Sequence, residues 1–435
     1  MTACRTTASL HLSFSPFWQR GAAGVGRRRS PNGALPSHVS TQWATSCHRA
    51  TTCIRFLSSD PGAPSQSRIN RLALGGSDFM SWLSWQRASI VGMPLLEERT
   101  LEQVIDVLAC DVGYFAVKTA YRVRGNIEAF SFPSVVARCA TREALRSNME
   151  LFGENAARVE VNVGDTTYAV NTGQTSLPSS AAVRAEVDDF PRTPKYAALI
   201  LACLKKIRAT KIRCLVLGLP VHTLERHSGY LKSTFCGALC LDGRSTCTVE
   251  RVVVLPQPLG TYAHLRDRHL IPASRQVSTC IADIGWHTTD VVVFQPDGSL
   301  DVARSMGLSG GAARVVREVA RLAGEQTGTR LENLDRVDHA LRTGERLLHF
   351  GKHVDLAPHL RAALMDTYEV AHAVLTGLKT SEDLQVFVSG GGARFYMDTL
   401  SNALGLEIQL VERSHMANCL GFLAAAEAVQ RQGAR

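Results

Sequence analysis

Two aspartate-glycine turns, each at the end of a short apolar run, constrain the fold of this chain most. The first is Asp111-Val-Gly113, and the second is Asp283-Ile-Gly285. A second run of strand-forming residues follows each turn, so each segment predicts a strand, a tight turn and a second strand. A single turn of this kind is common in ordinary hairpins and predicts no ligand by itself. Two copies in one chain predict two related lobes whose turns can face each other.

The residue types in these turns suit phosphate and metal binding. Glycine permits a tight turn whose backbone N–H groups can approach phosphate oxygens. An aspartate can hold a hydrated Mg²⁺ ion and polarise water. The implied ligand is therefore a nucleoside triphosphate held between the two lobes.

Further segments with glycine or proline follow in one fixed order. Leu255-Pro-Gln257-Pro precedes the second turn, and Gly307-Leu-Ser-Gly-Gly311 after that turn opens a helix. A buried-strand pattern then ends at Gly390-Gly-Gly392, as expected where backbone must lie flat against a nucleoside. The last apolar helix pattern contains Ala417-Asn418-Cys-Leu-Gly421. The order of these segments says more than any one of them.

Periodicity predicts mixed α/β organisation in both halves. Alternation over 159–170 is typical of a small sheet near the cleft, 196–207 is apolar at helical spacing, and 212–220 is a buried strand that closes at glycine and proline. The second half repeats this logic with a helix over about 309–324 and, after a polar helical insert, a strand over 384–388.

Length and composition indicate a folded chain with more than one core. At 435 residues, 45% of them hydrophobic and 20% charged, the chain exceeds the roughly 250 to 300 residues at which one core usually divides. It contains no run of 18 apolar residues, so no transmembrane helix is expected. Residues 1–100 carry a net charge of +7 out of the total of +9.

Three interpretations are open for residues 1–100, which are rich in Ser, Thr, Arg, Gly and Pro and are expected to be disordered. The first is an over-extended gene start, with the true initiator at Met80 or Met93. The second is a basic arm that contacts DNA or RNA, because arginines release counterions from phosphates. The third is an Arg-rich organellar transit peptide.

The twelve cysteines predict reduced thiols in a cytoplasm. No Cys-x-x-Cys pair occurs, and the spacing of Cys236, Cys240 and Cys247 near His227 fits no standard zinc finger. We expect these three cysteines to be ordinary small buried side chains, with a zinc site as the alternative.

With its motifs in this order, the chain resembles the actin-like ATPase superfamily, and within it the ParM/StbA plasmid-segregation group and the ParM-like D proteins of PRTRC gene clusters. The segments that carry the resemblance are Asp111-Val-Gly-Tyr114, Phe132-Pro-Ser134, Val163-Gly164-Asp-x-x-Tyr168, Leu217-Gly-Leu-Pro220-Val221, Leu255-Pro-Gln257-Pro, Asp283-Ile-Gly285, Gly307-Leu-Ser-Gly-Gly311 and Ser389-Gly-Gly-Gly392. They cover residues 104 to about 430.

The resemblance implies an α/β, two-lobed actin-like ATPase fold, built from duplicated ribonuclease H-like domains with inserted subdomains. Lobe I would span 104–272 with the first phosphate loop. Lobe II would span 273–430 with the second phosphate loop and the adenosine loop, and its last helix would pack back on lobe I.

The resemblance also implies catalytic roles. Asp111 and Asp283 would bind Mg²⁺ through water, and Lys118 would sit near the β- or γ-phosphate of ATP. Gln257 occupies the place where this superfamily carries a glutamate or glutamine that orients the attacking water. An amide is a poor base, which suits a slow timer better than a fast metabolic enzyme. The alternatives are a solvated strand-end lysine for Lys118 and a helix-entry glutamine for Gln257.

The remaining nucleotide contacts would come from backbone amides and hydroxyls near the turns and glycine clusters. These residues are Gly113, Tyr114, Gly285, Thr288, Thr289, Gly310, Gly311, Gly390, Gly391 and Gly392.

Two classes of function follow from the resemblance. The favoured one is a slow, Mg²⁺-dependent cytoplasmic ATPase that forms dynamic head-to-tail filaments for plasmid or mobile-element segregation. Its partners would be further copies of itself and a DNA-bound adaptor protein, with direct DNA contact left open and no membrane. The alternative is a non-polymerising member of the fold, either a small-molecule kinase or a nucleotide-gated adaptor or scaffold.

Overall fold

The computed structural model describes residues 103–139, 157–173, 184, 186–271, 276–366, 384–405 and 407–433. The chain divides into two units, Met1–Met93 and Pro94–Arg435, and every described residue belongs to the second. The basic leader therefore lies outside the described residues, as does the proposed lobe boundary at residue 272.

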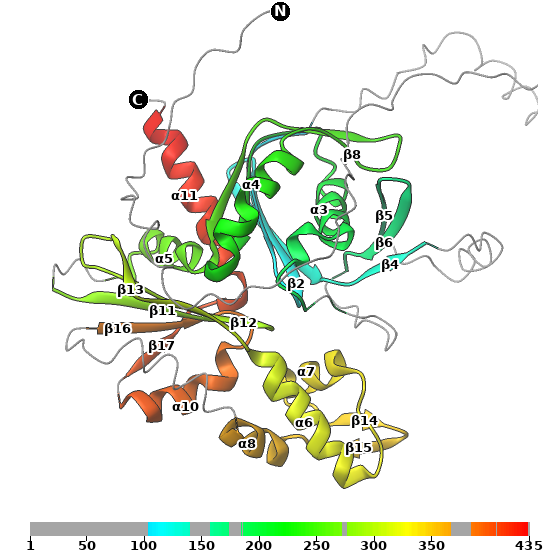
Figure 1. The fold of residues 1–435 in the computed structure, drawn as a ribbon, viewed down its shortest axis with the longest axis vertical. Helices are drawn as coiled ribbons and strands as arrows, with labels where there is room; N and C mark the ends of the chain where they lie inside the picture. Colours follow the sequence, from blue (N-terminus) through cyan, green and yellow to red (C-terminus); the bar gives the residue numbers. More distant parts are fainter. Residues whose placement is uncertain are drawn as a thin grey trace, which may run out of the picture. The chain divides into compact units, whose positions relative to one another are not determined.

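Among the described residues, lobe I contains a seven-stranded sheet in the order β3-β2-β1-β7-β9-β8, with β10 paired to β7 (Figure 1). Its strands are β1 (Val104–Val112), β2 (Ala116–Val123), β3 (Asn126–Pro133), β7 (Lys211–Leu219), β8 (Gly237–Cys240), β9 (Thr246–Val249) and β10 (Val252–Pro256). β1 and β2 form the expected antiparallel hairpin, whereas β1, β7 and β10 run parallel. A separate three-stranded sheet, β4-β6-β5, contains the expected alternating segment as β5 (Arg158–Val163) and β6 (Thr166–Asn171), beside β4 (Val136–Arg138).

Helices cover both faces of the β1–β7 region. α3 (Pro194–Lys206) begins at Thr193, whose side-chain oxygen accepts a hydrogen bond from Tyr196 N at 3.2 Å and so caps the first turn. Its apolar side packs in one core with Ile105, Leu108 and Leu215 of the sheet. The opposite sheet face, with Val107 and Val216, packs against α11 (Ala417–Gly433). The other helices of this half are α4 (Leu224–Phe235) and α5 (Gln257–Asp267).

Lobe II contains a five-stranded sheet in the order β13-β12-β11-β16-β17. Its strands are β11 (Ser278–Ile284), β12 (Thr288–Phe294), β13 (Leu300–Ser309), β16 (Leu384–Ser389) and β17 (Ile408–Leu410). β11 and β12 form the second expected hairpin, and every residue of both strands is buried. Burial on both faces explains the uninterrupted apolar runs Cys280–Ala282 and Val291–Phe294 within these strands.

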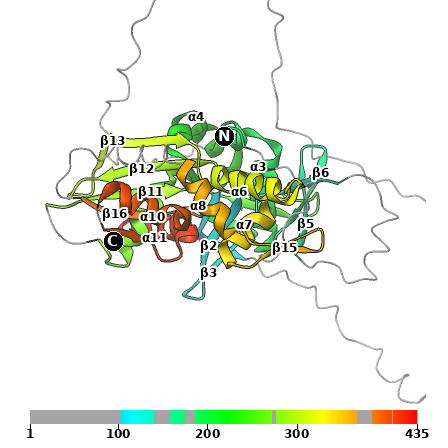
Figure 2. The same cartoon turned by 90° about the horizontal axis from the view of Figure 1, so that it is seen from below.

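Helices complete lobe II on the side of its sheet opposite α5 (Figures 1 and 2). They are α6 (Ala312–Thr327), α7 (Leu334–Thr343), α8 (Ala357–Asp366) and α10 (Ala393–Leu404). The helix expected over about 309–324 begins at Ala312, after Gly311, and ends at Gly328, whose left-handed φ of 69° stops it. The polar insert is not wholly helical, because β14 (Leu347–His349) and β15 (Lys352–Val354) form a hairpin within it.

Two helices exchange between the lobes. α5 follows β10 of lobe I but packs Tyr262 and Leu265 on the lobe II sheet, whereas α11 follows β17 of lobe II but packs on the lobe I sheet. These two helices also pack against each other. The polypeptide therefore crosses between the lobes at α5 and again at α11. No helix in the described part of the chain is long and apolar enough to span a membrane.

Candidate functional site

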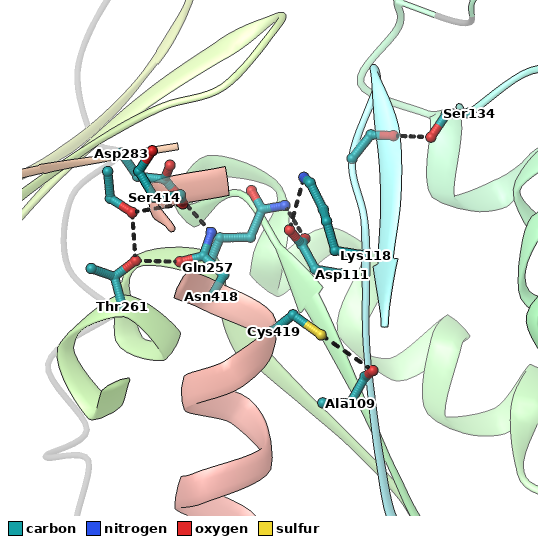
Figure 3. Close-up of polar contacts among 12 residues, drawn as sticks. Ala109, Asp111, Lys118, Ser134, Gln257, Thr261, Asp283, Ser414, Asn418 and Cys419 are labelled. Atoms are coloured by element: carbon teal, nitrogen blue, oxygen red, sulfur yellow. Dashed lines mark hydrogen bonds and ion pairs between the residues drawn. The ribbon is translucent and has the colours of Figure 1, made fainter. Parts of the chain in front are cut away.

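Residues of both hairpin turns line one cavity of about 1060 Å³. Asp111 and Lys118 of lobe I and Asp283 of lobe II are on its wall, together with Gln257 at the start of α5. The predicted turns therefore face each other across a shared space, and Figure 3 shows how these four side chains converge.

In the first turn, each oxygen of the aspartate carboxylate accepts a hydrogen bond from a side chain. Asp111 is 1% exposed, and the β1–β2 register places it opposite Lys118. Lys118 Nζ donates to Asp111 Oδ2 at 3.0 Å. Gln257 Nε2 donates to Oδ1 at 2.6 Å. Burial lowers the pKa of Lys118, but the charge and hydrogen bond of Asp111, with Asp283 beyond, outweigh it and raise that pKa above its ordinary value.

Gln257 reaches Asp111 because β10 runs parallel to β7 in the same sheet as β1, and α5 begins directly where β10 ends. Pro258 occupies the first turn of α5, where its missing N–H leaves no helix hydrogen bond unmade. Gln257 is therefore a helix-entry residue that also lines the cavity, and its role in orienting water stays a prediction. The Gln257 side chain points into the cavity rather than to bulk solvent.

The second turn holds its carboxylate differently. Asp283 is 6% exposed, and Asn418 Nδ2 at the start of α11 donates to its Oδ2 at 2.6 Å. Burial raises the pKa of Asp283 to about 6, with a further contribution from Asp111, while Asn418 and Lys118 oppose the rise. The backbone of the turn is closed by Gly285 N, which donates to Thr288 O at 2.9 Å.

The triple glycine lies beside this second turn. β16 runs parallel to β11 and pairs Ser389 with Asp283, so the residues after Ser389 pass the Asp283 carboxylate. Gly390 has a φ of +90°, and a Cβ there would lie 2.3 Å from Ile284 O and 2.4 Å from Asp283 Oδ1. Only glycine fits this position. All three glycines line the cavity, as do Gly113, Tyr114, Gly285 and Thr288.

Three predicted binding residues lie behind the cavity wall rather than on it. Thr289 is fully buried, and its Oγ1 donates to Gly310 O at 2.8 Å. A Cβ on Gly311 would lie 2.5 Å from Gly285 O, so this glycine packs directly under the turn. These residues support the second turn, and their contact with a nucleotide stays a prediction.

The structure brings Asp290 to the cavity, a residue that the sequence reasoning did not single out. Asp290 is 1% exposed and accepts a hydrogen bond from Val221 N of lobe I at 3.1 Å. Burial raises its pKa well above the ordinary value, and the neighbouring Asp283 raises it further. The sequence feature that could have identified Asp290 is its position as a single carboxylate directly before the apolar run Val291–Phe294.

The cavity is also lined by charged groups that no local sequence motif predicted. Arg342 on α7 makes two hydrogen bonds to Asp338, at 2.6 and 2.7 Å, and also donates to Gly391 O. Arg184 of lobe I pairs with Asp335 of lobe II and donates to Phe115 O. These contacts depend on how α7 packs against its neighbours, and the sequence of a polar helix does not predict that packing.

The cysteine cluster differs in part from expectation. Cys247 is buried, but Cys236 and Cys240 are exposed, because Cys236 follows the last turn of α4 and Cys240 ends the edge strand β8. Within the described ranges, no group of three or more His, Cys, Asp or Glu side chains is arranged to hold a metal ion.

Two protein-family domains match the chain. The N-terminal domain of actin-like proteins matches residues 109–260, and the C-terminal domain of the archaeal, MreB-like actin homologue matches residues 281–402. A comparison with curated proteins gave no match.

Solved structures are similar over about three quarters of the chain. The archaeal actin homologue Ta0583 has a TM-score of 0.61 at 18% identity and covers 74% of this chain and 100% of its own. Its complex with ADP has a TM-score of 0.58 at 19% identity, with the same coverage. A 15-stranded ParM filament from Clostridium botulinum has a TM-score of 0.58 at 16% identity and covers 75% of this chain and 100% of its own. The expected α/β actin-like fold is confirmed.

Proposed function

We propose that this chain, which has the fold of the actin-like ATPase superfamily, is a slow, Mg²⁺-dependent ATPase that holds ATP between its two lobes. One observation carries the proposal: Asp111 and Asp283, from equivalent turns of the two lobes, line a single cavity with Lys118 and Gln257. A cation, two carboxylates and an amide around one cavity are groups that can position and stabilise phosphoryl transfer to water.

The donor set at the cavity fits Mg²⁺. This ion prefers carboxylate and water oxygens and commonly takes only one or two carboxylates, the rest of its shell coming from water and phosphate. Asp111 and Asp283 would hold it through water, and the bound ion would neutralise charge that develops on the phosphates.

Lys118 and Gln257 have different proposed roles in the site. Lys118, 18% exposed in its side chain, offers a positive charge to the phosphates. Gln257 donates its amide N–H to Asp111, which leaves Oε1 as the atom that accepts a hydrogen bond from the attacking water. An amide positions water but does not take its proton efficiently, so turnover is expected to be slow.

We further propose that ATP-bound copies of the chain assemble head to tail into filaments that segregate a plasmid or mobile element. Support comes from the fold shared with a ParM protein whose structure is a filament. A heterologous contact that does not close on itself gives an open filament. A DNA-bound adaptor protein would then link the filament to its cargo.

Light scattering and electron microscopy of the full chain, with and without Mg-ATP, test this proposal. Polymers that appear with ATP and disappear as phosphate is released would support the filament. Binding of ATP without polymers would favour the non-polymerising alternatives, a small-molecule kinase or a nucleotide-gated adaptor or scaffold. Failure to bind any nucleotide would contradict the ATPase assignment itself.

A further inference from the structure

A buried hydrogen-bond chain connects α5 to the carboxylate of the second turn. Thr261 Oγ1 on α5 donates to Asn418 Oδ1 at 2.7 Å, and Asn418 Nδ2 donates to Asp283 Oδ2 at 2.6 Å. Thr261 is fully buried and Asn418 is 7% exposed. Asn418 lies on the cavity wall and Thr261 lies behind it, so the threonine is connected to Asp283 through the asparagine. Figure 3 shows the hydrogen bonds that join these three side chains.

The Thr261 hydroxyl and the Asp283 carboxylate together determine which way the Asn418 amide faces. The hydroxyl donates its single proton to Oδ1, and its oxygen lies 2.9 Å from Ser389 Oγ, which also contacts Ser414 O. A reversed amide would place Oδ1 against the Asp283 carboxylate, so two acceptors would meet without a proton whenever that carboxylate is ionised. With Asp283 ionised, only the orientation that points the Asn418 N–H at Asp283 and Oδ1 at the Thr261 hydroxyl satisfies every group.

The same helix reaches the carboxylate of the first turn. Gln257 and Thr261 are four residues apart on α5 and therefore lie one turn apart on one face of the helix. Gln257 contacts Asp111 directly, and Thr261 contacts Asp283 through Asn418. One turn of α5 is thus connected to the aspartates of both lobes.

Two glycines bring α5 and α11 close enough for this connection. A Cβ on Gly421 of α11 would lie 1.7 Å from Gly260 O, and a Cβ on Gly260 would lie 2.4 Å from Asn418 O. Side chains at either position would separate the helices and lengthen the Thr261–Asn418 contact. The hydrogen-bond chain and the helix crossing are therefore one structural unit.

We propose that Thr261 and Asn418 are positioning residues that fix Asp283 relative to Gln257, so that α5 aligns the metal-binding carboxylate of lobe II with the water-orienting amide. This inference rests on the proposed ATPase function. Thr261 touches neither the cavity nor any group expected to bind ATP, so its removal should alter the alignment of the site and leave nucleotide binding nearly intact.

The first test compares Thr261→Val with Thr261→Ser in steady-state ATP hydrolysis. Valine keeps the volume and removes the hydroxyl, and we expect kcat to fall about tenfold with KM within about twofold of wild type. Serine restores the hydroxyl and should restore kcat. Thr172→Val is a matched control, because Thr172 is 1% exposed, donates to Ala157 O at 2.8 Å and lies away from the cavity. Wild-type kcat in Thr261→Val would overturn the inference.

The second test needs no nucleotide and is a urea-unfolding cycle of Thr261→Val, Asp283→Asn and the double variant. Thr261 and Asp283 do not touch, and the side-chain hydrogen bonds that connect them pass through Asn418. With a neutral amide at position 283 either orientation of Asn418 finds a partner, so Thr261→Val should cost less stability in that background. Additive effects would overturn the inference. If Thr261→Val does not fold, Thr261→Ala replaces it in both tests.

The two tests separate the inference from the proposed function. A wild-type protein that hydrolyses no ATP but shows coupling in the unfolding cycle would contradict the ATPase and support the hydrogen-bond chain. The opposite result is an active wild type, a fully active Thr261→Val variant and additive effects in the unfolding cycle. It would support the ATPase and contradict the role of the hydrogen-bond chain.

Discussion

The two turns are built alike and charged differently. In the first hairpin the register places Lys118 opposite Asp111, so the carboxylate meets a cation within the same lobe. In the second hairpin the register places Asp290 opposite Asp283, so a carboxylate stands across from a carboxylate. A bound cation would therefore stabilise the carboxylate of the second turn more than that of the first.

Hydrogen bonding reinforces this difference. Both oxygens of Asp111 are engaged by side chains that donate to them. Asp283 is held at Oδ2 by the neutral amide of Asn418, while its Oδ1 lies beside Gly390. A duplicated fold thus gives one turn that is neutralised internally and one that keeps a raised pKa and a carboxylate oxygen beside the glycine loop. Equivalent positions in the two lobes need not have equivalent roles.

The largest effect is expected from removing the second carboxylate. Asp283→Ala should reduce ATP hydrolysis by about 10³-fold or more and weaken Mg²⁺-dependent nucleotide binding, because the metal-bound water loses its ligand. Phosphate release and nucleotide affinity, each measured with Mg²⁺ and with EDTA, check both parts. Full ATPase activity in this variant would remove Asp283 from the site and leave Asp111 as the principal metal-binding carboxylate.

A smaller effect is expected at the amide that joins α5 to the first turn. Gln257→Ala should lower turnover by about 10²-fold with nucleotide affinity near wild type, because an orienting group acts mainly in the transition state. Any filaments should then last longer, which time-resolved light scattering would show. If hydrolysis continues at the normal rate, water is oriented elsewhere, and Asp111 is the first residue to test.

The charge difference predicts opposite stability effects for the same substitution. In metal-free buffer at pH 7.5, Asp283→Asn should raise the free energy of unfolding by about 2–3 kcal/mol, because the buried charge is removed. Asp111→Asn should lower it by about 1–3 kcal/mol, because Lys118 loses its ionic partner. Urea unfolding of both variants would measure this, and two changes of the same sign would contradict the comparison.

The pH dependence gives a control for the Asp283 variant. The pKa of Asp283 is about 6 in the folded chain against 3.8 for an ordinary aspartate. Between these values the folded state keeps a proton that the unfolded state has lost, so this group makes wild-type stability fall as pH rises from about 4 to about 6. The gain from Asp283→Asn should therefore vanish below about pH 4 and be complete above about pH 7. A gain that does not change with pH would point to packing rather than charge.

The backbone of the site was predictable from sequence, because its shape is imposed by residue types. The apolar runs before Asp111 and Asp283 define buried strands, and Gly390 takes a left-handed φ in a space that admits no Cβ. The position of Gln257 was predicted only from its place in an ordered set of motifs. Its contact with Asp111 requires β1, β7 and β10 to lie side by side, which local pattern does not encode.

The partners that distinguish the two turns were not predictable in this way. Asn418 reaches Asp283 from a helix 135 residues later in the chain, and it does so only because α11 returns to pack on α5. Arg184 and Asp335 meet across 151 residues. Such contacts follow from how helices pack between lobes, so a local motif search finds the turns but not what holds them.

The smallest effect is expected from the region with the largest net charge. Deleting residues 1–92, which lie outside the described residues, should leave ATP affinity and thermal stability of the body unchanged, because every residue lining the cavity lies at Asp111 or later. Calorimetry and ATP titration of the full and shortened chains check this. If the leader is a DNA-binding arm, the same deletion should also abolish salt-sensitive DNA retention while hydrolysis persists, since its arginines carry the excess positive charge. Loss of folding on deletion would contradict both the over-extended gene start and the DNA-binding arm. It would show that the leader docks on the body that holds the two turns.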